Sequence, residues 1–237
     1  MLGDTCVDEY HYGVVDRISP EAPVPIFKYE SQQSRPGMAG NVEQNLLALG
    51  CEVVSIFGTP SKKVRLIDRK SKQHIARIDH DTVSEPVTVP QNLERYDAVI
   101  VSDYDKGSIE YRTIKRIRNT FSGPIFADTK KHHLDKFEGC FVKVNELEYS
   151  RRMSSYNDTI VTRGEKPVLY RDIQIPVEPV EVNDVCGAGD TFTAALAVKY
   201  IETNDVIESI KFAVAAARVT VQHFGVYAPT LEEIAKQ

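Results

Sequence analysis

Cysteine and histidine are scarce in this sequence and show none of the spacings typical of a metal site. Four cysteines occur among the 237 residues, and no two of them form a C-x-x-C pair. The six histidines form no H-x-x-x-H pair, the spacing that would place two imidazoles on one face of a helix. We therefore expect reduced thiols, a cytoplasmic location and no structural zinc.

Other absences exclude further classes of protein. No run of 18 apolar residues and no signal peptide is visible, so we expect no membrane association. The net charge is −5, with acidic and basic residues interspersed, and the tyrosines are scattered, which argues against a nucleic-acid surface. No Walker A motif, G-x-x-x-x-G-K-[ST], occurs.

What the sequence does contain is an alternation of short apolar runs and helical patterns. Apolar runs predict strands, and positions recurring every three to four residues predict helices. The expected strands are 52–57, 98–102, 124–127, 141–144 and 159–162, and the expected helices are 39–49, 109–120, 188–202 and 206–223. This order predicts a mostly parallel sheet covered on both faces, with ligands at the strand carboxyl ends. Asp103, Asp128 and Asn145 fall there.

Two segments, about 12–34 and 62–80, do not follow this alternation. Prolines in the first suit an edge strand, and the second alternates around a polar turn at 70–72. We expect a small antiparallel sheet that projects from the body, with Val64, Leu66 and Ile75 on one apolar side. Such a sheet is too small to be stable alone, so it must cover a substrate or a second subunit.

The stretch DVCGAGDTF, residues 184–192, carries the clearest chemistry. Gly187, Ala188 and Gly189 precede an apolar helix, and Asp190 lies in its first turn. Free peptide N–H groups at a helix start bind anions, and a carboxylate beside them accepts a proton, as phosphoryl transfer to an alcohol requires. A plain turn and cap is the structural alternative. A dinucleotide-binding loop is disfavoured because Phe192 occupies the position of its last glycine.

A second stretch, RPGMAGNVEQNLLALG at 35–50, resembles the N-terminal signature of the ribokinase-like (PfkB) carbohydrate kinases. DVCGAGD resembles the C-terminal signature of that family. GDTCVDEYHYG, RISPEAPVP, SDYDKG and ADTKK narrow the likeness to its heptose-7-phosphate kinases. The resemblance implies one domain, residues 1–237, with a three-layer α/β/α fold, a mostly parallel sheet and a small β-sheet lid. Apart from the resemblance, the apolar side of the small sheet favours a homodimer joined through the lids, because pairing two lids buries that side and closes the sheet edges.

The resemblance implies a role for each matching residue on the nucleotide side. Asp190 is the implied catalytic base, beside an anion hole at Gly187, Ala188 and Gly189. ATP and Mg²⁺ are the implied cofactors. Asn145 and Glu148 of NELE correspond to the residues that orient magnesium through water, and Thr162 and Gly164 lie near the nucleotide. Asp184 is either structural or close to a monovalent cation.

On the acceptor side, the implied reaction phosphorylates a sugar phosphate, foremost D-glycero-D-manno-heptose 7-phosphate at O1. The residues expected to bind the sugar are Asp4, Asp8, Gly37 and Asn41. A guanidinium or an ammonium suits the phosphate that the substrate already carries. The candidates for that contact are Arg35, Arg77 and Lys130, each of which is equally compatible with a solvated surface charge.

The sequence also departs from the family pattern. Met38 replaces a signature glycine, Cys186 replaces a threonine, and Pro167 stands where relatives have a second glycine. A loop, a helix and a strand are missing after Gly58, a shorter segment is missing after Glu148, and no H-x-G-H nucleotidyltransferase motif occurs. Two other hypotheses therefore stay open: an inactive or regulatory binding protein, and a kinase for another small sugar or a nucleoside.

Overall fold

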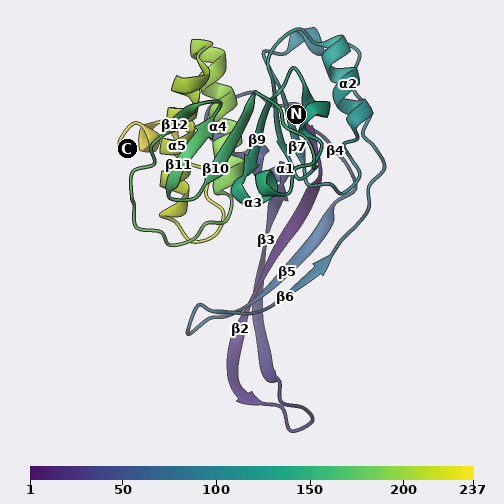
Figure 1. The fold of residues 1–237 in the computed structure, drawn as a ribbon. Coiled ribbons are helices and arrows are strands. Elements are labelled where there is room, and N and C mark those ends of the chain that lie inside the picture. The colour runs from purple at the N-terminus through teal and green to yellow at the C-terminus, as the bar shows by residue number, and fades with distance from the viewer.

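The computed structural model describes residues 1–237 as two sheets, a large one within the body and a small one that projects from it (Figure 1). The strands of the large sheet follow the order β12-β11-β10-β9-β8-β7-β1-β4, and those of the small sheet β3-β2-β5-β6. The strands span Leu2–Gly3 (β1), Thr5–Ile18 (β2), Pro25–Met38 (β3), Ile56–Phe57 (β4), Ser61–Asp68 (β5), His74–His80 (β6), Val99–Asp103 (β7), Ile125–Thr129 (β8), Phe141–Asn145 (β9), Thr159–Arg163 (β10), Lys166–Tyr170 (β11) and Ile173–Ile175 (β12). The helices span Ala39–Ala48 (α1), Tyr111–Thr120 (α2), Glu146–Ser150 (α3), Ala188–Thr203 (α4), Val206–Val221 (α5) and Leu231–Ile234 (α6), with 3₁₀ turns at Leu93–Arg95 (η1) and Leu134–Phe137 (η2).

Six neighbouring strands of the large sheet, from β10 to β4, run parallel, and β11 and β12 add an antiparallel edge. Parallel strands place their carboxyl ends along one edge of the sheet. Asp103, Thr129 and Asn145 end β7, β8 and β9 there. The sequence therefore predicted the parallel sheet and this edge correctly.

Both faces of the large sheet are covered. Ile100 and Phe126 pack with α1, α4 and α5 in one cluster of 21 buried residues. Val99 and Val101, which point to the other face, pack with α2, η1 and η2 in a second cluster of 17. This alternation along one strand follows from the two-residue period of β structure. The predicted α/β/α arrangement is confirmed.

Several element boundaries differ from the sequence prediction, and two of the differences have a clear physical cause. The strand expected over 52–57 is reduced to β4, because β4 pairs on one side only, with the two-residue strand β1. The second helix begins at Tyr111 rather than 109, because Glu110 forms a capping box with Thr113 and so fixes the helix start. Neither change moves an expected site residue.

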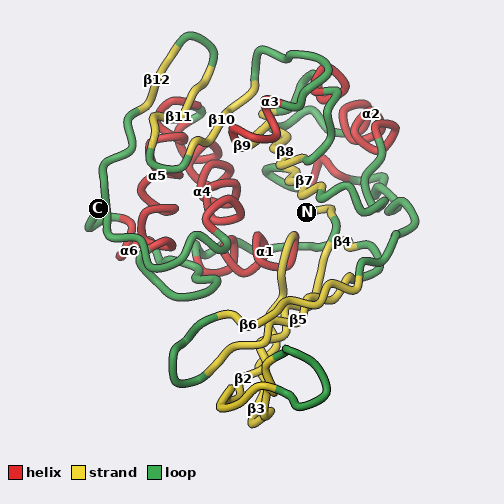
Figure 2. Tube along the Cα trace, turned by 60° about the horizontal axis from the view of Figure 1, so that its bottom comes forward, coloured by secondary structure: helices red, strands yellow, loops and turns green.

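The small sheet, called the lid below, contains the two segments expected there, but its strands are longer. It is also mixed and not antiparallel as expected, because its two antiparallel hairpins join through the parallel strands β2 and β5. The hairpin of β2 and β3 begins at Thr5 and ends at Met38, so Asp8, Arg35 and Gly37 lie on the lid itself (Figure 2). Ile75 was expected on the same side of the sheet as Val64 and Leu66, and this expectation was wrong. A bulge in the pairing of β5 with β6 makes Ile78 the partner of Val64.

None of the helices combines the length and the apolar character needed to span a bilayer.

Candidate active site

The glycine turn before α4 brings backbone and side chains of three elements together. Gly187 caps the helix with φ 81°, and a Cβ added there would lie 2.8 Å from Asn41 Nδ2. A Cβ on Gly189 would lie 2.7 Å from Lys143 Nζ. The N–H groups of Gly189 and Asp190 donate to no acceptor in the chain. Free donors at a helix start, beside an ammonium, form an anion-binding site.

Asp190 lies in the first turn of α4 with 6 % of its surface exposed. Asn41 Nδ2 donates to Oδ2 at 2.8 Å, and the Tyr104 hydroxyl donates to Oδ1 at 2.9 Å. Burial raises the pKa of Asp190 to about 6, although the hydrogen bonds from Asn41 and Tyr104 oppose the rise. Asp190 is thus a carboxyl group whose pKa lies near the range at which a general base works.

A row of alternating charges connects this turn to the ends of β8 and β9. Lys143 Nζ lies 2.8 Å from Asp128 Oδ2, and both side chains are almost fully buried. Lys130 Nζ lies 3.6 Å from Asp128 Oδ1 and 2.5 Å from Glu148 Oε1. Burial pushes the pKa of Asp128 upward, but Lys143 and Lys130 outweigh it and keep the pKa below its usual value.

Asn145 and Glu148 form a reciprocal capping box at the start of α3. The Glu148 N–H donates to Asn145 Oδ1 at 2.8 Å, and the Asn145 N–H donates to Glu148 Oε2 at 2.7 Å. Glu148 Oε1 points to Lys130 and not into the cap. The structure therefore places the expected magnesium-orienting pair beside Asp128, at the carboxyl edge of the sheet.

A cavity of about 280 Å³ opens beside the glycine turn on its other side. Thr162 and Gly164 line it, together with Ala188 and Gly189 of the turn. Its remaining wall is mostly apolar and comes from the connection before α4 and from α5, namely Val177, Val180, Val182, Val185, Val214 and Val221. A planar base suits such a wall, and a phosphate chain leaving it would reach the turn.

The lid supplies the opposite side of the site. The Asp8 carboxylate pairs with Arg65 at 2.5 Å, and both side chains are largely buried. Gly37, opposite Cys6 in the hairpin, has no room for a side chain because Asp8 fills that space. Asn41, which touches Asp190, follows at the start of α1. The structure therefore brings Asp8 and Gly37 together, with Arg65 beside Asp8 and Asn41 four residues after Gly37.

Four expected site residues have other partners. Asp4 is buried and accepts hydrogen bonds from the backbone N–H groups of residues 104, 106 and 108, so we leave it out of the sugar site. Asp184 accepts from the N–H groups of Cys186 and Gly225, which closes the loop before α4. Arg77 pairs with Asp79 on the exposed end of the lid, and Lys130 belongs to the charge row described above.

Sequence reasoning missed three side chains of this site: Tyr104, Lys143 and Arg65. Tyr104 lies within SDYDKG, which was used for the resemblance but not for chemistry. Lys143 interrupts the apolar run FVKV, and a charge in a buried strand signals a partner. Arg65 carried no signal, since only the pairing of β2 with β5 brings it to Asp8.

Comparison with known proteins agrees with the two signatures. Residues 149–234 match the model of the pfkB family of carbohydrate kinases. A bifunctional protein HldE from a Nitratiruptor species is 31% identical over 295 residues, covering 99% of this chain. The chain belongs to the pfkB family of carbohydrate kinases. A second HldE protein, from Campylobacter curvus, is 32% identical over 287 residues and 95% of this chain.

This pfkB chain spans 63% of the Nitratiruptor protein and 61% of the Campylobacter protein. Solved structures show the same fold at low identity. A ribokinase from Arabidopsis thaliana, complexed with ribose and ATP, superposes with a TM-score of 0.70 at 18% identity, covering 99% of this chain and 96% of that one. Phosphofructokinase-2 from Escherichia coli, in complex with potassium, superposes with a TM-score of 0.71 at 13% identity, covering 100% of this chain and 97% of that one. The ribokinase-like fold is thereby confirmed.

Proposed function

We propose that this chain transfers the γ-phosphoryl group of ATP to a hydroxyl of a sugar phosphate. One observation carries the proposal: a buried carboxyl group with a pKa of about 6 lies at a helix start whose free N–H groups and adjacent ammonium form an anion site. The mostly apolar cavity lies on one side of this centre and the lid on the other.

Asp190 acts as the general base in this proposal. Each carboxylate oxygen has two acceptor positions, and Asn41 and Tyr104 use one on each. The free positions accept the proton of the substrate hydroxyl as its oxygen attacks phosphorus. The two existing hydrogen bonds hold the carboxylate in one orientation, which limits the reorganisation required during the reaction.

The negative charge that develops on the moving phosphoryl group faces the turn. The N–H groups of Gly189 and Asp190 and the ammonium of Lys143 are donors already in place. Donors fixed before the reaction stabilise a transition state without having to reorient. Phosphoryl transfer depends on such positioning more than on covalent chemistry.

Magnesium is compatible with the residues at the sheet edge. No three His, Cys, Asp or Glu side chains gather into a metal cage. Asp128 Oδ1 is buried without a hydrogen-bond partner, and Glu148 Oε1 lies near it through Lys130. Mg²⁺ needs few protein oxygens because it retains water, so Asn145, Glu148 and Asp128 would hold it through water. When bound, the ion neutralises phosphate charge.

The acceptor that we propose is O1 of D-glycero-D-manno-heptose 7-phosphate. The segments GDTCVD and RISPEAPVP support this choice, and so does the match to HldE proteins over nearly the whole chain. The proposed reaction places the protein in the cytoplasm, where ATP is available. Another sugar phosphate or a nucleoside is the alternative acceptor, and an inactive binding protein is the alternative class.

A coupled assay of ADP release tests this function. We expect heptose 7-phosphate with Mg-ATP to stimulate release well above the rate with water as acceptor. Stimulation by another sugar alone would reject the substrate and keep the activity. Release that no sugar or nucleoside stimulates, together with ATP binding seen by thermal shift, would reject the kinase and favour the binding protein.

A further inference from the structure

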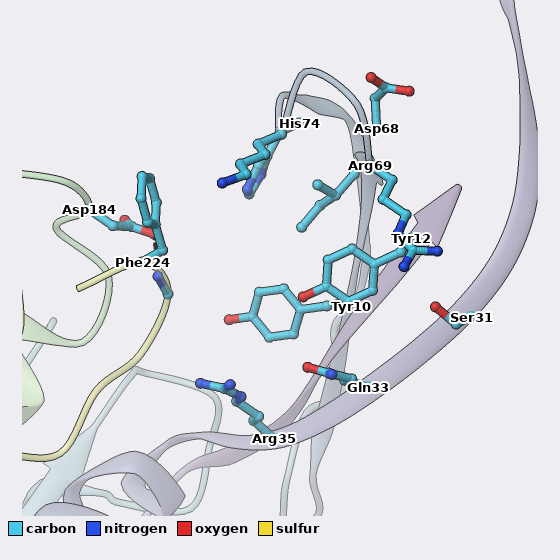
Figure 3. A pocket seen from close by; sticks show the side chains of 13 residues that line it. Tyr10, Tyr12, Ser31, Gln33, Arg35, Asp68, Arg69, His74, Asp184 and Phe224 are labelled. Atoms are coloured by element: carbon cyan, nitrogen blue, oxygen red, sulfur yellow. Dashed lines mark hydrogen bonds between the residues drawn. The ribbon is translucent and has the colours of Figure 1, made fainter. Parts of the chain in front are cut away.

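A second cavity, of about 490 Å³, lies between the lid and the loops that flank α4 and α5 (Figure 3). Tyr10, Tyr12 and Arg35 reach it from the β2–β3 hairpin, and Lys72 reaches it from the turn between β5 and β6. Phe224 closes it from the body, beside Asp184. Of the residues named here, only Arg35 and Asp184 have been considered for a role so far.

The cavity is rich in hydrogen-bond donors that lack charged partners. Arg35 donates from one nitrogen to the carbonyl of Val226 at 2.9 Å and pairs with no carboxylate. Lys72 forms no salt bridge, and its ammonium lies 5.8 Å from the centre of the Phe224 ring. The Tyr10 hydroxyl is buried and has no hydrogen-bond partner, and only 8 % of the surface of Tyr10 is exposed. A buried donor without a partner is costly unless a ligand supplies the acceptor.

The acidic side chains of the cavity already have hydrogen-bond partners. Asp68 accepts from the N–H of Val15 and from both the N–H and the hydroxyl of Ser71. Asp184 accepts two backbone N–H groups, as described above. Arg69, also in the wall, pairs with Glu30 at 3.2 Å. The unpaired charge that remains in the cavity is therefore positive.

The local backbone presents Lys72 to the cavity. Lys72 has φ 59°, in the left-handed region that non-glycine residues seldom adopt. The turn is held by the Lys72 N–H, which donates to the Asp68 carbonyl at 2.8 Å, and by the Ser71 contacts to the Asp68 side chain. Neighbouring Lys70 is exposed and does not line the cavity.

The cavity continues the sugar face of the proposed kinase site. Asp8 and Tyr10 point to the same side of β2, about 7 Å apart, as alternate residues of a strand do. Arg65 links them, pairing with Asp8 and lying 5.1 Å from the Tyr10 ring. At the other end, Asp184 opens the loop that leads to Asp190. The cavity thus adjoins the proposed sugar face on the lid and the loop before the glycine turn.

We propose that this cavity binds the phosphate that the sugar substrate already carries, with Lys72 and Arg35 as its charged ligands and the Tyr10 hydroxyl as a third donor. The inference rests on the proposed function for the identity of the sugar. Of the three cationic side chains that the sequence suggested for this phosphate, the proposal retains Arg35. It replaces Arg77 and Lys130, whose charges are engaged by Asp79 and by Asp128 with Glu148.

Binding measurements without ATP test the site separately from catalysis. Calorimetry would compare the parent chain, Lys72→Gln and the matched control Lys70→Gln, each titrated with heptose 7-phosphate and with the same heptose lacking phosphate. We expect Lys72→Gln to weaken binding of the sugar phosphate at least tenfold and Lys70→Gln to change it less than twofold. The sugar without phosphate should bind all three proteins within twofold.

Inorganic phosphate provides a second probe that does not depend on the sugar. We expect it to raise the melting temperature of the parent and of Lys70→Gln, to raise that of Lys72→Gln much less, and to compete with the sugar phosphate. Competition in the parent and in Lys70→Gln, but not in Lys72→Gln, assigns the site to the phosphate of the substrate. Phosphate protection without sugar-phosphate binding would instead assign it to free phosphate and overturn the substrate role.

The proposal is wrong if Lys72→Gln binds heptose 7-phosphate as tightly as Lys70→Gln does. It is also wrong if Lys72→Gln loses affinity for both sugars equally, or if neither phosphate probe binds the parent. Failure of the proposed function looks different. Sugar phosphate that binds through Lys72 without any ADP release would retain the site and reject the kinase. ADP release with an unchanged KM in Lys72→Gln would retain the kinase and reject the site.

Discussion

At the scale of single residues, Asp190 is the side chain on which the proposed chemistry depends. Asp190→Asn preserves shape but removes the proton acceptor, and its single amide oxygen can accept from only one of Asn41 and Tyr104. We expect kcat to fall by about 10²–10⁴-fold with little change in either KM, because general-base catalysis is typically worth that much. Steady-state kinetics with both substrates measures the effect. A variant that turns over within about threefold of the parent would show that another group is the base.

The same substitution has a consequence for stability. The folded-state pKa of Asp190, about 6, lies above its ordinary value of 3.8, so the folded protein binds this proton more tightly than the unfolded chain. The ionised group therefore costs stability, and the cost appears as pH rises from about 4 to 6. We expect Asp190→Asn to be more stable than the parent at pH 8, by on the order of 1 kcal/mol, and no more stable at pH 4. Urea unfolding at the two pH values tests this; equal differences at both would contradict it.

Tyr104 tunes that base through one hydrogen bond. Its hydroxyl favours the charged form of Asp190, so Tyr104→Phe should raise the pKa of the base further. The acidic limb of the kcat/KM profile should then move to higher pH, by about one unit. Tyr96→Phe, which removes a hydroxyl that contacts Arg95, is the control. A profile that Tyr104→Phe leaves in place would mean that the contact is only structural.

At the scale of elements, the start of α4 has a requirement that helix propensity alone would not suggest. Alanine normally favours a helix over glycine, by about 1 kcal/mol. In Gly189→Ala, however, the new methyl group would meet Lys143 Nζ and fill the anion site. We expect kcat to fall by about 10²-fold or more while the melting temperature does not drop. Activity close to that of the parent would exclude this turn from the phosphoryl site.

The elements also show which parts of the fold and of the site the sequence could predict. The helices and parallel strands follow from local periodicity, and the glycine turn and Asp190 follow from a motif. The partners of Asp190 do not, because Asn41 and Tyr104 come from segments 149 and 86 residues away. The register of β5 with β6 was missed for a related reason. A bulge shifts which residues face each other, and no residue in the segment marks it.

At the scale of the whole molecule, the lid has a second face that points away from the cavities. Val7 and Ile78 on this face are 37 % and 47 % exposed, beside Val64. We propose a homodimer in which two lids pair through these faces, since an apolar sheet of four strands needs a cover. Ile78→Glu should give a monomer by light scattering at micromolar concentration. Val83→Glu, on the body and 87 % exposed, should leave the dimer intact.

A parent protein that is already monomeric would reject this assembly. The apolar groove of about 620 Å³ along β4, between α1 and η1, would then be the next candidate for a subunit interface. In the family pattern a helix is missing after Gly58, the residue that follows β4. The alignment with the Nitratiruptor relative runs over 295 positions, more than the 237 residues of this chain, so the relative carries segments that this chain lacks.

Asp4, which does not belong to the proposed sugar site, fixes the backbone of a loop that reaches the base. Its carboxylate collects three amides of the loop that carries Tyr104, and Tyr104 in turn touches Asp190. The amides of Tyr104, Lys106 and Ser108 should therefore exchange with deuterium among the slowest in any loop of this protein, with or without ligand. The hydroxyl that favours the charged form of the base is thus held in place by the folded body before a substrate arrives.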